Sequence, residues 1–153
     1  MNEHDIYKIE FDEERRILHV AYRRRIHPAT EKQLDKVFAY FHGLLDQYTK
    51  TGRIYLIIDM TNLIIEPELK AFYMAHAREV IDKYIMPQGV ARYGFQITRI
   101  TVRSGYQQYS YESPNIFNSR EEAYQYIYSL IEKNEEMSGN PPVTAMTEDS
   151  ASC

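Results

Sequence analysis

Several residue types that support common chemistry are scarce in this sequence of 153 residues. The single cysteine, Cys153, allows no disulfide within the chain and no thiolate metal cluster, which fits a reducing compartment. Six glycines leave little room for phosphate-binding loops, and no glycine-rich phosphate loop, G-x-S-x-G elbow or H-E-x-x-H pattern occurs. We therefore expect no cofactor, and the sequence assigns no catalytic residue.

Long hydrophobic runs and an excess of basic charge are also missing. No apolar run approaches the roughly 20 residues that cross a bilayer, and residues 1–12 alternate charged and apolar positions instead of forming a signal-peptide core. We expect no membrane span and a cytoplasmic location. The formal net charge of −4 argues against broad nucleic-acid binding, which depends on clustered lysine and arginine.

The composition that remains is that of a globular protein. Hydrophobic residues make up 44% of the chain and charged residues 26%, and the length suits one domain with a real core. From Met137 on the sequence contains S-G-N-P-P and little apolar matter. We therefore predict one domain over residues 1–136 and a flexible tail over residues 137–153.

Apolar patterns in the first half predict a hairpin, a helix and a buried strand. Residues 6–11 and 17–22 are apolar-rich runs across a polar turn, which indicates a β-hairpin. Thr30 and Gln33 form a capping box, and apolar residues at helical spacing follow as far as Tyr48. The continuous apolar run 54–58, bounded by Gly52 and Asp59, is typical of a central strand covered on both faces.

The second half predicts two more helices and further strands. Pro67 suits the first turn of a helix that Pro87 and Gly89 would stop. Residues 95–102 and 115–117 are predicted strands, and Ser119 with Glu122 caps a last helix that ends near residue 136. Because helices and strands interleave, we predict an α/β fold with a single mixed sheet of four to five strands, an N-terminal hairpin and about three packed helices.

One motif resembles a known family. The run Ile57-Ile58-Asp59-Met60-Thr61-Asn62 is a buried strand that ends in an acid and a hydroxyl residue before a helix. It resembles the central motif of STAS domains, the sulfate-transporter and anti-sigma-factor-antagonist modules. Residues 116–123 resemble the short strand and final helix of the STAS-like branch grouped with Sec14-type lipid-binding domains. The resemblance covers roughly residues 6–131 and implies a STAS-like fold and a regulatory module that binds a protein.

The same resemblance places a phosphorylatable serine just before the second helix, but this sequence has no serine there. The corresponding stretch is Ile65-Glu66-Pro67-Glu68. Its two glutamates put permanent negative charge at a helix N-terminus, where anions are stabilised by about 0.3–1 kcal/mol each at an exposed site. Thr61 is the hydroxyl residue left in the loop. We predict a protein-docking surface, constitutively charged, at Asp59, Thr61, Asn62, Glu66 and Glu68.

Two other interpretations of this loop stay open. Its carboxylates could act as an acid-base pair or hold a hard cation, which would make the chain an enzyme or a metal protein. They could also serve only as caps, since an acid at the end of a buried strand commonly caps the next loop. The five histidines have no i, i+4 pair that would favour a zinc site: His4, His19, His27, His42 and His76.

A carrier of a small apolar or lipid-like ligand is the main alternative function. The Sec14-type branch suggests it, together with residues on or after the second helix: Phe72, Tyr73, His76, Tyr84 and Phe95. Arg23 and Arg25 are candidates for an anion contact, because arginine binds such groups with a planar fork. Tyrosines suited to an interface, and so to a homodimer, crowd the last third of the chain: Tyr106, Tyr109, Tyr111, Tyr124, Tyr126 and Tyr128.

Overall fold

The computed structural model of this chain describes residues 6–94 and 115–137. Their secondary-structure elements, in chain order, are β1 (Tyr7–Asp12), β2 (Ile17–Tyr22), α2 (Glu31–Tyr48), β3 (Ile54–Asp59), the 3₁₀ turn η1 (Pro67–Leu69), α3 (Lys70–Tyr84), β4 (Ile85–Tyr93), β5 (Ile116–Phe117) and α5 (Arg120–Met137). None of the described helices combines the length and the apolar character needed to span a bilayer.

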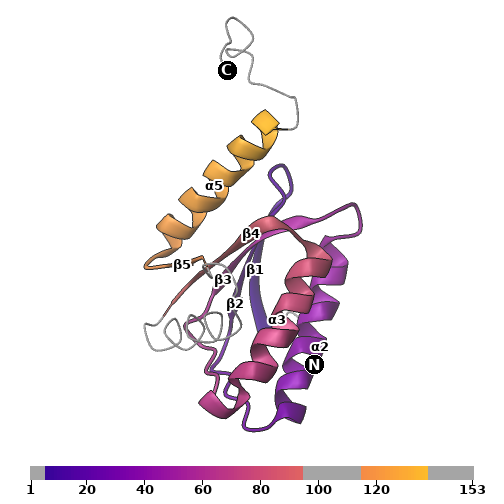
Figure 1. Cartoon of the computed structure of the whole chain (residues 1–153), viewed down its shortest axis with the longest axis vertical. Helices are drawn as coiled ribbons and strands as arrows, with labels where there is room; N and C mark the ends of the chain where they lie inside the picture. Colours follow the sequence, from indigo (N-terminus) through magenta and orange to yellow (C-terminus); the bar gives the residue numbers. More distant parts are fainter. Residues whose placement is uncertain (1–5, 95–114, 138–153) are drawn as a thin grey trace, which may run out of the picture.

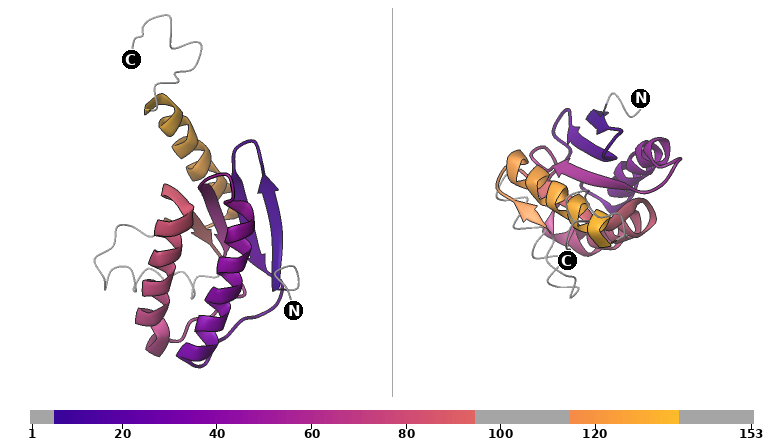
Figure 2. Two further views of the ribbon diagram at one scale, coloured as in Figure 1. Left: turned by 90° about the vertical axis from the view of Figure 1, so that its right-hand side faces the viewer. Right: turned by 90° about the horizontal axis from the view of Figure 1, so that it is seen from above.

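The strands form one five-stranded sheet in the order β1-β2-β3-β4-β5. Strands β1 and β2 pair antiparallel, and the remaining neighbours pair parallel. Helices α2 and α3 lie side by side on one face of the sheet, and α5 lies on the other (Figures 1 and 2). The predicted fold class is confirmed: a mixed sheet with an antiparallel N-terminal hairpin and three helices in the described part of the chain.

The helix starts follow the capping chemistry in the sequence. The Thr30 hydroxyl accepts a hydrogen bond from the Gln33 amide (3.1 Å), and the Gln33 side chain accepts one from the Ala29 amide (2.7 Å). At α5 the Ser119 hydroxyl accepts from the Glu122 amide at 3.2 Å. Both predicted caps are confirmed, because each satisfies amides that a helix leaves without an internal partner.

Strand β4 corrects the prediction for the chain after the second helix. Pro87 and Gly89 do stop the helix, but they lie inside a strand that begins at Ile85, directly after α3. The register jumps from Ile54↔Ile85 to Leu56↔Val90, so four β4 residues bulge opposite a single β3 residue. Pro87 is tolerated because it sits in this bulge. The strand predicted over residues 95–102 lies outside the described residues.

Two apolar cores lie on the two faces of the sheet. The larger fills the space between the sheet and α2 with α3, where Leu34, Leu44 and Leu45 are fully buried. The smaller lies under α5. There Ala91 of β4 and Ala123 of α5 are both fully buried, and their small side chains let helix and sheet approach closely.

Candidate functional site

The stretch from Asp59 to Glu68, which we call the acidic junction, leaves the sheet at the end of β3. The Asp59 carboxylate accepts a hydrogen bond from the Thr61 amide at 2.9 Å, and the Met60 amide donates to the Tyr93 carbonyl at 2.6 Å. Asp59 is therefore the cap of the turn that follows the strand, as the structural interpretation of this acid predicted. Thr61 is half-buried beside it.

Further backbone hydrogen bonds hold the middle of the junction. The Asn62 side-chain amide donates a hydrogen bond to the Tyr22 carbonyl (2.9 Å). The main-chain carbonyl of Asn62 accepts one from the Ile26 amide (2.7 Å). The Ile64 amide in turn donates to the Ile26 carbonyl at 2.9 Å. The junction thus extends the pairing of the sheet beyond the strand ends, with little backbone freedom left.

The end of the junction presents its acids to solvent. Ile65 and Leu69 are buried and anchor the start of the helix, which begins as the turn η1. Between them Glu66 forms a hydrogen bond with the His27 imidazole, and the exposed Glu68 has no ion pair with any described residue. Glu68 is therefore exposed and Glu66 half-buried at the outer end of the junction, while the half-buried Asp59 and Asn62 hold its backbone through hydrogen bonds.

A second polar cluster, which sequence reasoning missed, lies on the α5 face of the sheet. His19 is only 4% exposed, and its Nε2 lies 2.5 Å from the Tyr93 hydroxyl. Its Nδ1 lies 3.7 Å from Glu10, which accepts a hydrogen bond from Arg120 at 2.9 Å. Arg120, at the start of α5, also stacks over the Tyr124 ring at 5.3 Å. We call these residues, Glu10, His19, Tyr93, Arg120 and Tyr124, the histidine cluster.

The ionisation of the histidine cluster follows from burial and from the Arg120 charge. Burial lowers the pKa of His19, with Arg120 adding to the effect and Glu10 opposing it. The hydrogen bond from Arg120 lowers the pKa of Glu10, and burial raises that of Tyr93 well above its ordinary value. Near neutral pH the cluster is therefore a neutral histidine and a protonated tyrosine beneath a charged glutamate-arginine pair.

Asp59 connects the two sites, since its charge further raises the pKa of Tyr93, its register neighbour in the sheet. Period-two alternation puts Glu10, His19 and Asp59 on one face of the sheet, but contacts such as that between His19 and Tyr93 join distant parts of the chain. Only the tertiary fold brings them together. No group of three potential metal ligands occurs among the described residues.

The residues predicted for an apolar ligand do not surround one cavity. Tyr73 faces the space between α2, α3 and the sheet, but Phe72 stacks on His76 (ring centroids 4.2 Å apart). Tyr84 donates to Asp46 at 2.8 Å, and burial, with Asp46, raises its pKa to about 12. Phe95 lies outside the described residues.

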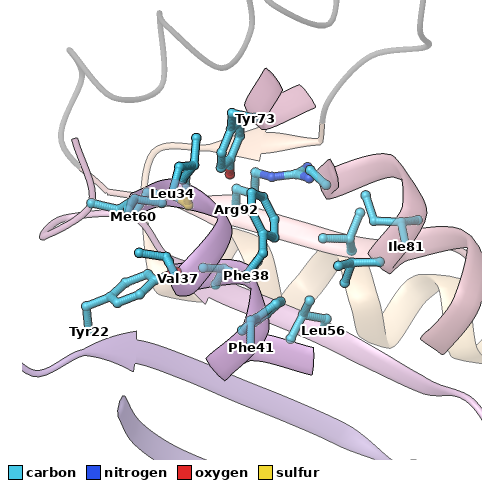
Figure 3. A pocket seen from close by; sticks show the side chains of 15 residues that line it. Tyr22, Leu34, Val37, Phe38, Phe41, Leu56, Met60, Tyr73, Ile81 and Arg92 are labelled. Carbon is cyan, nitrogen blue, oxygen red and sulfur yellow. The ribbon is translucent and has the colours of Figure 1, made fainter. Parts of the chain in front are cut away.

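The cavity itself, drawn in Figure 3, is small. Its volume is about 30 Å³, and its wall carries mainly apolar side chains together with the buried Arg92. A cavity of this size holds about one or two water molecules, whereas ligand pockets measure roughly 300–1,000 Å³. The interior between the helices and the sheet is therefore packed.

The two arginines predicted to contact an anion follow the end of β2. The Arg23 side chain donates to the Tyr7 carbonyl at 3.0 Å, at the outer strand of the sheet, and Arg25 is exposed. Among the predicted interface tyrosines, Tyr126 donates to the Gln88 carbonyl at 2.8 Å, and the exposed Tyr128 lies under Arg15. Tyr106, Tyr109 and Tyr111 lie outside the described residues, so the tyrosine-rich interface stays a prediction.

Comparisons with known proteins give one structural likeness. No family model and no curated protein matches the sequence. The chain is similar to a solved structure described as "The overall structure of SLC26A9", with 16% sequence identity and a TM-score of 0.48. The alignment covers 82% of this chain and 22% of that one, so the chain spans about a fifth of its length. The element order, the mixed sheet and the N-terminal hairpin of the described residues agree with the α/β fold class predicted from the sequence.

Proposed function

We propose that this chain is a non-enzymatic, STAS-like regulatory module that docks a protein partner through the acidic junction. The observation that carries the proposal is the combination of a fixed backbone with exposed acids. Hydrogen bonds in which Asp59 accepts and Asn62 and Ile26 donate hold the junction, and Glu66 and Glu68 lie at its outer end. A surface that is already ordered loses little conformational entropy when a partner binds.

The charge of the junction indicates the kind of partner. Two carboxylates that lie two residues apart at the start of η1 attract a basic surface, and such complementarity speeds encounter and fixes orientation more than it adds affinity. Because residues 59–68 contain no serine, the residue that the family phosphorylates is missing here, and Thr61 is the hydroxyl residue left in the loop. We infer that docking is constitutive and is controlled on the partner's side.

Charge reversal at the exposed acids tests this function. The full-length chain, the single variant Glu68→Lys and the double variant Glu66→Lys/Glu68→Lys serve as bait in quantitative pull-downs from cell lysate. Glu68→Lys leaves the contact between Glu66 and His27 intact, so it separates partner binding from the local fold. We expect the double variant to lose the partner by at least about tenfold and the single variant to weaken it.

The matched control is Glu79→Lys/Glu132→Lys, which makes the same change in net charge at exposed positions of α3 and α5. It should retain the partner, and circular dichroism should show all four proteins folded. Equal capture by the double variant and the wild type would exclude the acidic junction as the docking site.

Neither alternative function has comparable support. A carrier needs room for its ligand, and the cavity behind α2 and α3 holds about 30 Å³. An enzyme using the loop carboxylates needs acids that face a reacting group. Here the Asp59 carboxylate is hydrogen-bonded to the Thr61 amide, and the Glu66 carboxylate is hydrogen-bonded to the His27 imidazole.

A further inference from the structure

Strand β1 is the outer strand of the sheet, as Figure 2 shows, and among the described residues it pairs only with β2. The Arg23 amide donates to the Ile6 carbonyl at 2.8 Å, which makes these two residues a hydrogen-bonded pair of the antiparallel ladder. Since such pairs alternate, Lys8 and Glu10 direct their backbone groups toward β2. The backbone groups of Ile9 and Phe11 point outward, away from the sheet.

The side chains of β1 are self-complementary under a two-fold axis. If two copies of β1 run antiparallel with Ile9 opposite Ile9, Lys8 of each copy lies opposite Glu10 of the other. On the other face Phe11 lies opposite Tyr7. Each opposite-charge pair across two strands contributes about 0.2–1 kcal/mol relative to alanine, whereas Tyr7 is fully buried against its own chain and adds no exposed aromatic surface to the contact. In this register the Ile9 residues of the two copies form a hydrogen-bonded pair at the two-fold axis, so their outward backbone groups find partners.

The apolar core is incompletely covered along the same edge. Most of the half-buried hydrophobic residues that border the larger core lie at or near β1 and on α2: Ile6, Ile9, Phe11, Ile26, Val37, Tyr40 and Tyr48. A hollow of about 190 Å³ opens there between the edge strand and α2. A second copy would cover this rim with the same rim of its own, as an isologous two-fold interface does.

We propose that β1 is a self-association edge, through which two copies of this chain form one continuous ten-stranded sheet with a two-fold axis at Ile9. The acidic junction follows β3, and none of its exposed acids belongs to the proposed contact. We infer a second copy and not a foreign strand as the partner, because the order Lys8, Ile9, Glu10 is complementary in charge to its own reverse. In this register the Tyr7 carbonyl, which already accepts a hydrogen bond from the Arg23 side chain at 3.0 Å, also faces the Phe11 amide of the second copy.

Mixing two charge variants of the full-length chain tests the proposal. In a dimer of the Lys8→Glu variant, the glutamate at position 8 of each copy lies opposite Glu10 of the other copy. In a dimer of the Glu10→Lys variant, the lysine at position 10 of each copy lies opposite Lys8 of the other copy. Each variant alone should dissociate about tenfold more readily than the wild-type dimer in sedimentation equilibrium. An equimolar mixture restores both opposite-charge pairs, so it should form a heterodimer with near wild-type stability.

Hydrogen exchange then locates the interface. In the wild-type dimer the amides of Ile9 and Phe11 should be protected in a concentration-dependent way, and in either variant alone they should exchange freely. Because Glu10→Lys also removes the Arg120 contact, restoration in the mixture shows that both variants are folded. A wild-type chain that stays monomeric at about 100 μM would overturn the proposal, leaving the edge to a strand of another protein. A dimer that survives Lys8→Glu, or one without protection at Ile9, would overturn it as well.

Discussion

At the scale of single residues, the histidine cluster shows how burial sets the charge of a side chain. His19 lies in the middle of β2, 4% exposed, with its two ring nitrogens directed at Tyr93 and Glu10. The groups that face it are Lys8 and Glu10 from β1, Asp59 from β3, Tyr93 from β4, and Arg120 with Tyr124 from α5. Burial lowers the pKa of His19 more than the carboxylates of Glu10 and Asp59 raise it, so the imidazole is neutral in the folded chain.

This burial makes the stability of the domain depend on pH. Because the folded pKa of His19 lies below its ordinary value of about 6.5, the unfolded chain binds a proton that the folded chain does not. Stability is fully present above about pH 6.5 and falls as the pH drops toward the folded pKa, by at most about 1.4 kcal/mol per pH unit. Chemical unfolding of the wild type between pH 7.5 and about 5, above the range of carboxylate titration, should show this slope.

The variant His19→Gln should flatten the slope, because glutamine keeps a polar partner for Tyr93 but does not titrate. A slope of equal size in His19→Gln would place the proton uptake elsewhere.

At the scale of elements, the end of β4 positions the acidic junction. Gly94 follows β4 with a φ of +142°, and a Cβ placed there would lie 2.7 Å from the Thr61 nitrogen and 2.9 Å from the Met60 carbonyl carbon. Both neighbours are backbone atoms that the sheet holds in place. The close approach of these two segments is what fixes the first turn of the junction.

Gly94→Ala should therefore destabilise the domain more than Gly52→Ala. Gly52 has a similar φ of +143° but nothing within 4 Å of its virtual Cβ, so it reports backbone strain alone. Strain of this kind costs about 1–3 kcal/mol, and overpacking at Gly94 should add about 1–3 kcal/mol. Urea unfolding of the two variants measures the difference. An equal loss of unfolding free energy in the two variants would show that the junction shifts to make room for the added Cβ at no cost in stability.

At the scale of the whole molecule, the two faces of the sheet differ in character. The face under α2 and α3 is a packed apolar core whose cavity is about 30 Å³. The face under α5 combines a small apolar core with the histidine cluster at the start of the helix. The proposed contacts with other molecules lie on neither face but at the outer strand and at the loop beyond β3.

A packed interior predicts that the chain carries no apolar ligand. Native mass spectrometry of the purified full-length chain should give the mass of the polypeptide, alone or as a dimer, and benzene should not raise its melting temperature. Leu34→Ala is the positive control, since it removes a fully buried side chain from the cavity wall and should create a site for benzene. A lipid-sized mass on the wild type would favour the carrier instead.

The sequence by itself determined the elements whose signals are local. The caps at Thr30 and Ser119, the apolar stripe of α2, the hairpin and the buried run of β3 each depend on residues a few positions apart, and all were predicted from them. The turn at Asp59 belongs to the same class, because its cap reaches only two residues along the chain.

Tertiary structure decided what depends on distant neighbours. Pro87 and Gly89 read locally as the end of a helix, and only pairing with β3 makes Ile85–Tyr93 a strand with a bulge. His19, Tyr93 and Arg120 carry no shared local pattern and meet because strands and helix converge on one face. The size of the cavity likewise depends on how α2 and α3 pack, since packing density is a property of the assembled core and not of any one segment.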